Sequence, residues 1–421
     1  MTNHTISFSS LFASLLIATA VQAHDIGHAH EHVENGWNSK AGFVSDTDHT
    51  AYLWNPRGKS QEEINARIQF LAEAYVPSRT PEQEKRAAAA KAKYKNYIAI
   101  NSVMPAAVAP AMAMGEAHFH KGLKENHEAG ITLASASVYN TKAIFGDTLP
   151  STIANTDQSI TAFGAKKIDT IADIRQAKKT GTLAVMYNTQ GADFVLDGSL
   201  KDNLKWSSQV GIRVMNTTYN NDNALAGGGS KGTSGLTKKG KTFVKYANQQ
   251  GIVLDCSHAS NQTCIDTANE SKKPIVASHS NVYALYPHTR NLTDDAILAI
   301  GQRDGAVCPT GAGGFLSKDG SASPEIFAEH VVYVANLIGK DKVCYSTDAV
   351  HNVMDFYQVA VPNTEVYPPE LGMAAPIENL HAKHIWDVVA VLEDKYNWSQ
   401  NDIVGFLGEN LMRVYEANWK K

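Results

Sequence analysis

Eight short apolar runs, rich in valine, isoleucine and alanine, recur from residue 96 onward, with longer amphipathic stretches between them. The runs are YIAIN (97–101), ITLASAS (131–137), TLAVMYN (182–188), GIRVMN (211–216), GIVLDC (251–256), PIVAS (274–278), GAVCP (305–309) and KVCYS (342–346). Nearly continuous apolar runs suit parallel strands that are buried on both faces, and each gap is long enough for a helix. Eight strand–helix units predict an α/β fold, a closed (β/α)8 or TIM barrel, in which chemistry occurs where the strands end.

The chain divides into three segments. Residues 1–23 carry a short apolar core, LFASLLIATAV, that ends in Val-Gln-Ala, and we interpret them as a secretory signal. Residues 24–95 form an N-terminal extension, which begins with a His-rich stretch and continues in charged, alanine-rich sequence. That sequence favours two helices, with Pro77 and Pro81 between them. Residues 96–421 hold the barrel and, after it, C-terminal helices.

Composition and charge exclude several kinds of partner. The formal charge is −4, and no Lys/Arg cluster is interleaved with aromatic residues, so we expect no nucleic acid. No apolar segment after the leader is long enough to span a membrane, and we therefore expect a periplasmic or secreted protein, with a homodimer as one possible assembly. The four cysteines are too sparse for a disulfide framework, so we expect buried thiols or one bridge at most.

Polar side chains follow five of the eight runs at the ends where a barrel places its chemistry. They are Gln190 after the third run, Asn216 and Tyr219 after the fourth, His258 after the fifth, His279 after the sixth and Asp348 after the eighth. A lone histidine at a strand end more often bonds to the backbone than to a metal. Two imidazoles on neighbouring strands, however, favour one shared divalent ion, with a carboxylate or amide completing its ligand shell.

Arg290 follows the sixth run in the sequence HTRN. It fits two roles, a solvated loop arginine or a planar fork that binds a substrate carboxylate.

Five motifs in fixed order resemble those of the membrane (renal-type) dipeptidase family, peptidase family M19. They are GIRVMNTTYNNDN, GLTKKGKTFVKYANQQGIVLDCSHAS, PIVASHSNVYALYPHTRNLTDD, GAVCPTGAGGF and EHVVYVANLIGKDKVCYSTD. The resemblance covers about residues 96–418 and implies a TIM barrel of the metal-dependent hydrolase type, with a two-zinc centre that cleaves dipeptides.

Carried onto this chain, the resemblance makes His258 and His279 ligands of one zinc. It makes Arg290 the clamp for the C-terminal carboxylate of a small peptide-like substrate, and Asp348 the acid/base. We also expect Asn216 and Asn281 among the substrate-binding residues.

Three positions depart from the family pattern. The His-x-Asp pair expected after the first strand is replaced by INSVMP (100–105). Gln190 stands where the family has a glutamate that bridges both metals, and Tyr219 stands where it has a carbonyl-polarising histidine. A second dication needs anionic ligands to offset repulsion between the ions, so we expect one zinc, with Gln190 as a third ligand, rather than two.

Two classes of function follow. The first is a metal-dependent hydrolase that cleaves a dipeptide or similar small amide with an activated water, using Asp348 as base and Tyr219 to steady the oxyanion. The second is a dipeptidase-like protein without peptidase chemistry, which binds or tautomerises a peptide-like ligand, for example in periplasmic siderophore maturation.

Overall fold

The computed structural model describes residues 54–73, 79–110, 115–230, 232–318, 320–372 and 377–419. The predicted signal (1–23) and the His-rich stretch that follows it lie outside these described residues.

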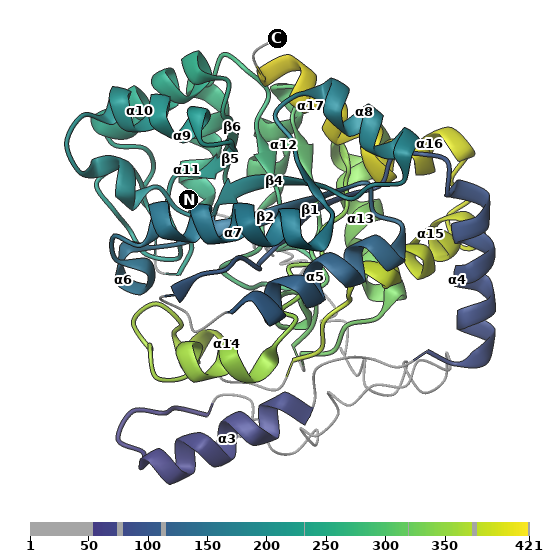
Figure 1. Cartoon of the computed structure of the whole chain (residues 1–421), viewed down its shortest axis with the longest axis horizontal. Helices are drawn as coiled ribbons and strands as arrows, with labels where there is room; N and C mark the ends of the chain where they lie inside the picture. The colour runs from purple at the N-terminus through teal and green to yellow at the C-terminus, as the bar shows by residue number, and fades with distance from the viewer. Residues whose placement is uncertain are drawn as a thin grey trace, which may run out of the picture.

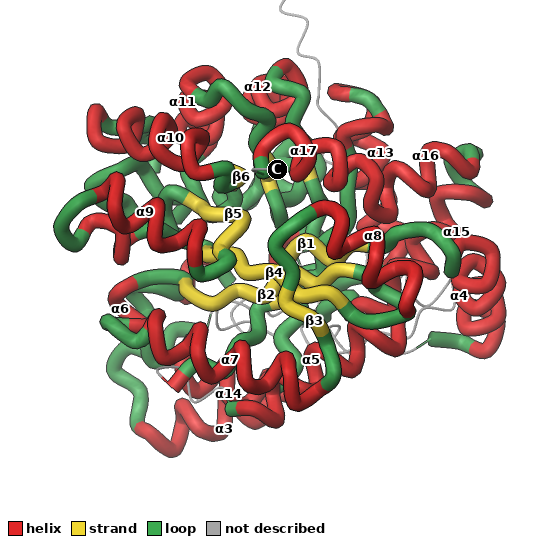
Figure 2. The backbone as a smooth tube through the Cα atoms, turned by 45° about the horizontal axis from the view of Figure 1, so that its top comes forward, coloured by secondary structure: helices red, strands yellow, loops and turns green. Residues whose placement is uncertain are grey.

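A curved sheet of parallel strands lies at the centre of the molecule, with helices around it (Figure 2). The strands are β1 (Ile100–Met104), β2 (Leu133–Tyr139), β3 (Lys166–Lys167), β4 (Ala184–Thr189), β5 (Ile212–Asn216), β6 (Val253–Asp255), β7 (Val276–Ala277) and β8 (Ala306–Val307). They are ordered β1-β2-β4-β5-β6-β7-β8, and the short β3 pairs with β4. Each of the first seven predicted runs overlaps one strand of this path, whereas β3 lies outside all the predicted runs.

The eighth run, 342–346, closes the barrel without forming a regular strand of its own. Val343 makes a parallel bridge with Val307 of β8, and the Cys344 amide donates to the Val307 carbonyl at 3.0 Å. On its other side, the Tyr345 carbonyl accepts a hydrogen bond from the Ser102 amide of β1 at 3.2 Å. The predicted TIM-barrel fold is therefore confirmed.

Helices follow the strands in the expected alternation (Figure 1). They are α5 (Glu116–Ala129), α6 (Lys142–Phe145), α7 (Leu149–Phe163), α8 (Ile171–Thr180), α9 (Leu200–Gln209), α10 (Lys238–Gln250), α11 (Asn261–Glu270), α12 (Asp294–Gln302), α13 (Pro324–Ile338), α14 (Val353–Ala360), α15 (Ile385–Asp394), α16 (Gln400–Val404) and α17 (Asn410–Asn418). Side-chain caps fix several of the starts: Thr170 begins α8 in a capping box, and Ser260 accepts from the Thr263 amide at the start of α11.

The N-terminal extension contains the two helices that were predicted, α3 (Gln61–Glu73) and α4 (Pro81–Tyr94). Pro81 occupies the first turn of α4, where its missing N–H costs nothing. Helix α4 packs beside α15, and α3 lies against α14 (Figure 1), where Leu71 is buried with Tyr357. Because α14 contributes Phe356 and Tyr357 to the wall of the cavity described below, α3 supports that wall from outside.

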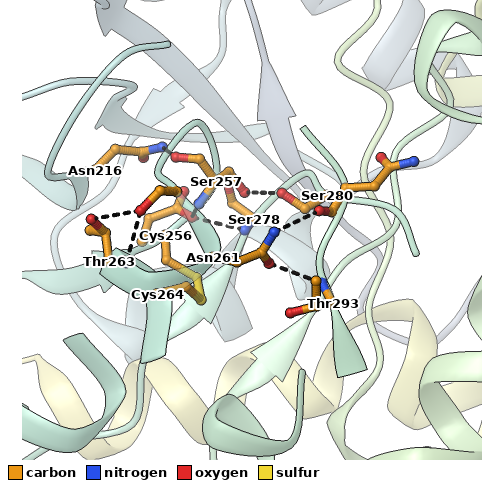
Figure 3. Close-up of a disulfide and its surroundings, with 12 residues drawn as sticks. Asn216, Cys256, Ser257, Asn261, Thr263, Cys264, Ser278, Ser280 and Thr293 are labelled. Carbon is orange, nitrogen blue, oxygen red and sulfur yellow. Dashed lines mark hydrogen bonds between the residues drawn. A yellow bond between two sulfur atoms is a disulfide. The ribbon is translucent and has the colours of Figure 1, made fainter. Parts of the chain in front are cut away.

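The cysteine prediction was wrong, because two disulfides form and the described residues contain no free cysteine. Cys308 and Cys344 lie on adjacent segments at the barrel's closing seam, with their Cα atoms 4.3 Å apart. Cys256 joins Cys264 of α11 across 5.1 Å (Figure 3). Counting cysteines carries no information on which segments become neighbours, and that neighbourhood decided both pairings.

Candidate active site

A cavity of about 120 Å³ opens at the C-terminal ends of the strands. Five of the predicted site residues line it: Gln190, Tyr219, His258, Arg290 and Asp348. Much of the remaining wall is apolar or aromatic, from Tyr139, Phe145, Phe315, Phe356, Tyr357, Tyr367, Leu371 and Ile377. Asp348 is the one carboxylate and Arg290 the one cation among the described residues that line the cavity.

The turns after β6 and β7 are tied together by buried polar groups. The Asp255 carboxylate at the end of β6 accepts from the backbone amides of Ser257 (2.9 Å) and Ser278 (3.0 Å). The Ser257 hydroxyl accepts from the His279 amide at 3.0 Å. His258 itself sits at φ 65°, a conformation that non-glycine residues rarely adopt, so the turn holds its side chain in a specific direction.

The two imidazoles lie beside each other and are fully buried. The ring centroids of His258 and His279 are 4.7 Å apart; His258 lines the cavity, whereas His279 is not among its lining residues. Nδ1 of His258 donates to the Asn220 amide oxygen at 2.7 Å, and Nδ1 of His279 lies 2.7 Å from the Ser278 hydroxyl. Burial, with Arg290 nearby, lowers the pKa of both histidines well below the usual value, so both are neutral near pH 7.

This pair fits a divalent ion. Each Nδ1 has a hydrogen-bond partner, and each Nε2 is buried with no partner among the described residues. A neutral imidazole whose other nitrogen is oriented by a hydrogen bond is the usual form of a zinc ligand. His258 and His279 would therefore hold one ion.

Arg290 is buried, and none of its three guanidinium nitrogens has a hydrogen-bond partner among the described residues. The guanidinium carbon lies 5.0 Å from the centre of the Phe315 ring, which leaves the planar edge of the fork available. An unpaired buried charge is costly unless an anion joins it. The cavity thus contains a site for an anionic group, and a carboxylate matches the fork in two parallel hydrogen bonds.

Asp348 and Tyr219 supply the proton-transfer groups. Burial raises the pKa of Asp348 to about 7, against the opposing effect of Arg290. At neutral pH this carboxylate can therefore either accept or release a proton. Burial and the neighbouring Tyr367 raise the pKa of Tyr219, so its hydroxyl remains a donor, and its ring stacks on His258 with centroids 4.2 Å apart.

The remaining predicted residues differ in their positions. Gln190 lines the cavity, and its amide nitrogen donates to the Ser137 hydroxyl at 3.1 Å. Asn216 donates to the Ser257 carbonyl and so supports the turn that carries His258 (Figure 3). The side-chain amide nitrogen of Asn281 donates to the Thr310 carbonyl, and its amide oxygen accepts from the Thr310 backbone amide. The structure does not bring Asn216 or Asn281 to the cavity wall, so substrate contact by either stays a prediction.

Two functional neighbours were missed by sequence reasoning. Asn220 orients His258, and its place beside Tyr219 in the TYNN motif was an available signal. Tyr367 hydrogen-bonds through its hydroxyl to that of Tyr219 at 3.3 Å. It comes from a segment without helical or strand periodicity, and nothing in the sequence around it points to the cavity.

The barrel with this rim site is the architecture of a metal-dependent hydrolase. The family model for membrane dipeptidase, peptidase family M19, matches residues 116–355, more than half of the chain. The chain therefore belongs to the membrane dipeptidase family.

Individual proteins are similar to this chain in sequence or in fold. A protein from Klebsiella pneumoniae described as an "uncharacterized protein in pqqA 5'region" is 32% identical over 188 residues, which are 42% of this chain and 69% of that protein. The solved amidohydrolase from Pseudomonas aeruginosa has a TM-score of 0.69 at 23% identity, over 79% of this chain and 99% of its own.

Two further solved structures share the fold. They are the probable dipeptidase PvdM from Pseudomonas aeruginosa (TM-score 0.63, 16% identity, 81% of this chain and 99% of its own) and a metallo peptidase from Rhodobacter sphaeroides liganded with a phosphinate mimic of L-Ala-D-Ala (TM-score 0.59, 17% identity, 77% and 99%). Among the described residues, no helix combines the length and the apolar character needed to cross a membrane.

Proposed function

We propose that this protein hydrolyses a dipeptide, or a similarly small amide with a free carboxylate, at the rim of the barrel. The observation that carries the proposal is the unpaired, buried Arg290 guanidinium in the same cavity as His258, whose Nε2 is also unpaired. The Arg290 guanidinium requires an anion, and Nε2 of His258 offers a lone pair to a metal ion. Together they fit a substrate that presents a carboxylate close to the bond that is cleaved.

Each residue has a defined task in this reaction. Arg290 binds the substrate carboxylate and thereby fixes the position of the amide carbonyl. Asp348, with its pKa near neutrality, takes a proton from the attacking water and passes it to the leaving amine. Tyr219 donates its hydroxyl hydrogen to the oxygen on which negative charge develops. A zinc ion held by His258 and His279, with Gln190 nearby, would supply Lewis-acid polarisation and a more acidic water.

The shape of the cavity favours a small substrate with an apolar side chain. Its volume of about 120 Å³ is close to the roughly 150 Å³ of an engineered apolar cavity that binds benzene. Aromatic rings such as Phe145 and Phe356 form much of the wall around the polar centre. We therefore propose a peptide-like substrate of about dipeptide size.

We also propose a periplasmic or secreted location. Two disulfides in one barrel support an oxidising compartment, because cytosolic thiols are kept reduced. The interpretation of residues 1–23 as a secretory signal supports the same location.

One observation favours a second function, binding or tautomerisation of a peptide-like ligand without hydrolysis. Among the described lining residues the single carboxylate is Asp348, and Gln190 takes the place of an anionic bridge. Asp348 and Tyr219 can shuttle a proton without any ion. Arg290 would bind the same carboxylate in both functions.

The test is turnover of dipeptides by the full chain supplied with zinc. L-Ala-D-Ala and dipeptides with a larger apolar N-terminal residue are incubated with protein, and released amino acids are measured by chromatography. Asp348→Asn should lower kcat/KM by about 10² to 10⁴, the usual contribution of a general base. Asp394→Asn, at a carboxylate that is 64% exposed on α15, is the matched control and should retain full activity. Tight binding of these dipeptides without any release of amino acids would reject hydrolysis and favour the second function.

A further inference from the structure

A second group of metal-ligating side chains lies outside the substrate cavity. Glu125 of α5 accepts hydrogen bonds from Nδ1 of His351 at 3.0 Å and from Nδ1 of His381 at 2.6 Å. Among the described residues this is the one group of three histidine, cysteine or acidic side chains whose ligand atoms all lie within 4.8 Å of one another. Both histidines are buried, and Glu125 is partly buried. None of the three residues lines the substrate cavity.

The spacing of these atoms is close to that of a tetrahedral metal site. Zinc–nitrogen and zinc–oxygen bonds near 2.0–2.1 Å put neighbouring ligands of a tetrahedral ion about 3.3 Å apart. The contacts of 2.6 and 3.0 Å therefore need to open by about 0.7 and 0.3 Å for the carboxylate and one nitrogen of each ring to share an ion. Two imidazoles with one carboxylate form a ligand set that divalent transition metals commonly take.

The cluster of Glu125, His351 and His381 borders a cavity that opens to solvent, and another imidazole lies near it. A cavity of about 530 Å³ is lined by Glu125 and His381 and gives an ion a route from solvent. A further buried imidazole, His118 of α5, has its ring centroid 6.1 Å from that of His351. Gly122 is the reason the helix can approach, because a Cβ there would lie 2.8 Å from the His351 ring.

We propose that Glu125, His351 and His381 bind a divalent transition-metal ion at a site separate from the His258 and His279 pair. The three ligands come from α5, from the loop after the eighth run and from the segment before α15, so the ion links parts of the chain that are far apart in sequence. His351 is three residues after Asp348 and one after Val350, both of which line the substrate cavity. The ion thus positions the loop that carries Asp348, and the three ligands are positioning residues. This site does not depend on the proposed hydrolysis.

The experiment measures zinc bound per full-length chain after dialysis against a low zinc concentration, by elemental analysis. Glu125→Gln keeps the shape of the side chain but removes its charge, and with His351→Gln it forms the test pair. Lys121→Ala lies in the same cavity and is the matched control. Each test variant should bind one ion fewer than wild type, and the control should bind the same number. Because all variants carry the same His-rich N-terminal stretch, its contribution cancels in the differences.

The double variant His258→Ala/His279→Ala removes the two rim ligands, so that metal bound at the second site can be measured without the rim site. Loaded with cobalt, this variant should keep the intense visible bands of a four-coordinate ion, and adding Glu125→Gln should remove them. Unchanged zinc content in a folded Glu125→Gln or His351→Gln variant, checked by circular dichroism, would overturn the second site. If the test variants do not fold, absence of four-coordinate cobalt bands in the rim double variant would overturn it instead. Absence of dipeptide turnover by the wild-type protein with this second site loaded would count against the proposed hydrolysis alone.

Discussion

Two residues that line the cavity, Arg290 and Asp348, are ionisable groups kept largely away from solvent. Arg290 is a buried cation without a hydrogen-bond partner among the described residues, and Asp348 is a partly buried carboxyl whose pKa is raised to about 7. Each is costly to the fold by itself, because charge in a buried site loses its hydration. Such costs are typical of groups kept for binding or proton transfer.

Replacing Arg290 by lysine should weaken ligand binding while keeping the positive charge. Lysine cannot form two parallel hydrogen bonds to one carboxylate, so the affinity for L-Ala-D-Ala, measured by calorimetry, should fall at least tenfold, or about 1.4 kcal/mol. The C-terminal amide of the same dipeptide is the control ligand, and its weaker binding should be nearly equal in both proteins. Equal affinity of wild type and variant for the free dipeptide would remove Arg290 from the binding site.

Asp348 should make the protein less stable as pH rises. Its folded pKa of about 7 lies above the unfolded value of about 3.9, so the native state binds the proton more tightly. This contribution is complete below pH 4 and is lost between about pH 4 and 7, a change of up to about 4 kcal/mol. In urea titrations with a chelator present, Asp348→Asn should therefore gain stability over wild type across that interval. A difference that stays constant from pH 4 to 8 would contradict a raised pKa.

At the scale of elements, the N-terminal helices are attached to the barrel by one buried ion pair and by apolar packing. Arg79, just before α4, donates to the Asp387 carboxylate of α15 at 2.6 Å, and both side chains are largely buried. Within α4, Arg86 pairs with Asp394 at the same distance, but both side chains are exposed. The two pairs differ in burial, and Arg79 also donates a second hydrogen bond to Asp387 at 3.0 Å and one to the Lys383 carbonyl at 2.7 Å.

Arg79→Met should therefore cost far more stability than Arg86→Met. Removing Arg79 leaves a carboxylate buried without its partner, with an expected loss of about 3–5 kcal/mol in the free energy of unfolding, partly relieved if Asp387 takes up a proton. The exposed pair is expected to contribute about 0–1 kcal/mol. Urea denaturation of the two single variants measures both values. Similar losses would show that the buried pair is not what fixes α4 to α15.

At the scale of the whole molecule, the barrel is closed by a segment with little regular hydrogen bonding of its own. Residues 343–346 bridge β8 on one side and contact β1 on the other. The disulfide between Cys308 and Cys344 crosses this seam with a sequence separation of 36 residues. It therefore restrains the part of the barrel where the ladder is weakest.

Removing this disulfide should destabilise the protein more than removing the other one. The chain-entropy relation gives about 4 kcal/mol for a loop of 36 residues and about 2.5 kcal/mol for the separation of 8 between Cys256 and Cys264. Alanine pairs at each bridge, compared by urea denaturation, test the order. The smaller loss at Cys256 and Cys264 should come with a larger loss of ligand affinity, because that bridge flanks His258. A reversed order of stabilities would mean that the seam is held by packing alone.

The sequence by itself determined the barrel, because the period of eight buried runs depends only on where apolar residues stand in the chain. It also determined which residues reach the rim, since His258, Arg290 and Asp348 each follow a run whose end must face that side. The departures from the family pattern at Gln190 and Tyr219 were also visible in the sequence, because the family has other residue types at these two positions.

Only the tertiary structure decided which distant side chains meet. Cys308 pairs with Cys344, Tyr367 reaches Tyr219, and Glu125 joins two histidines from the far end of the chain. Local pattern cannot encode these contacts, because they depend on how neighbouring strands align and how loops without periodicity fold over the rim. The same packing buries Arg290 and part of Asp348, and that burial, which no short stretch of sequence encodes, raises the proton affinity of Asp348.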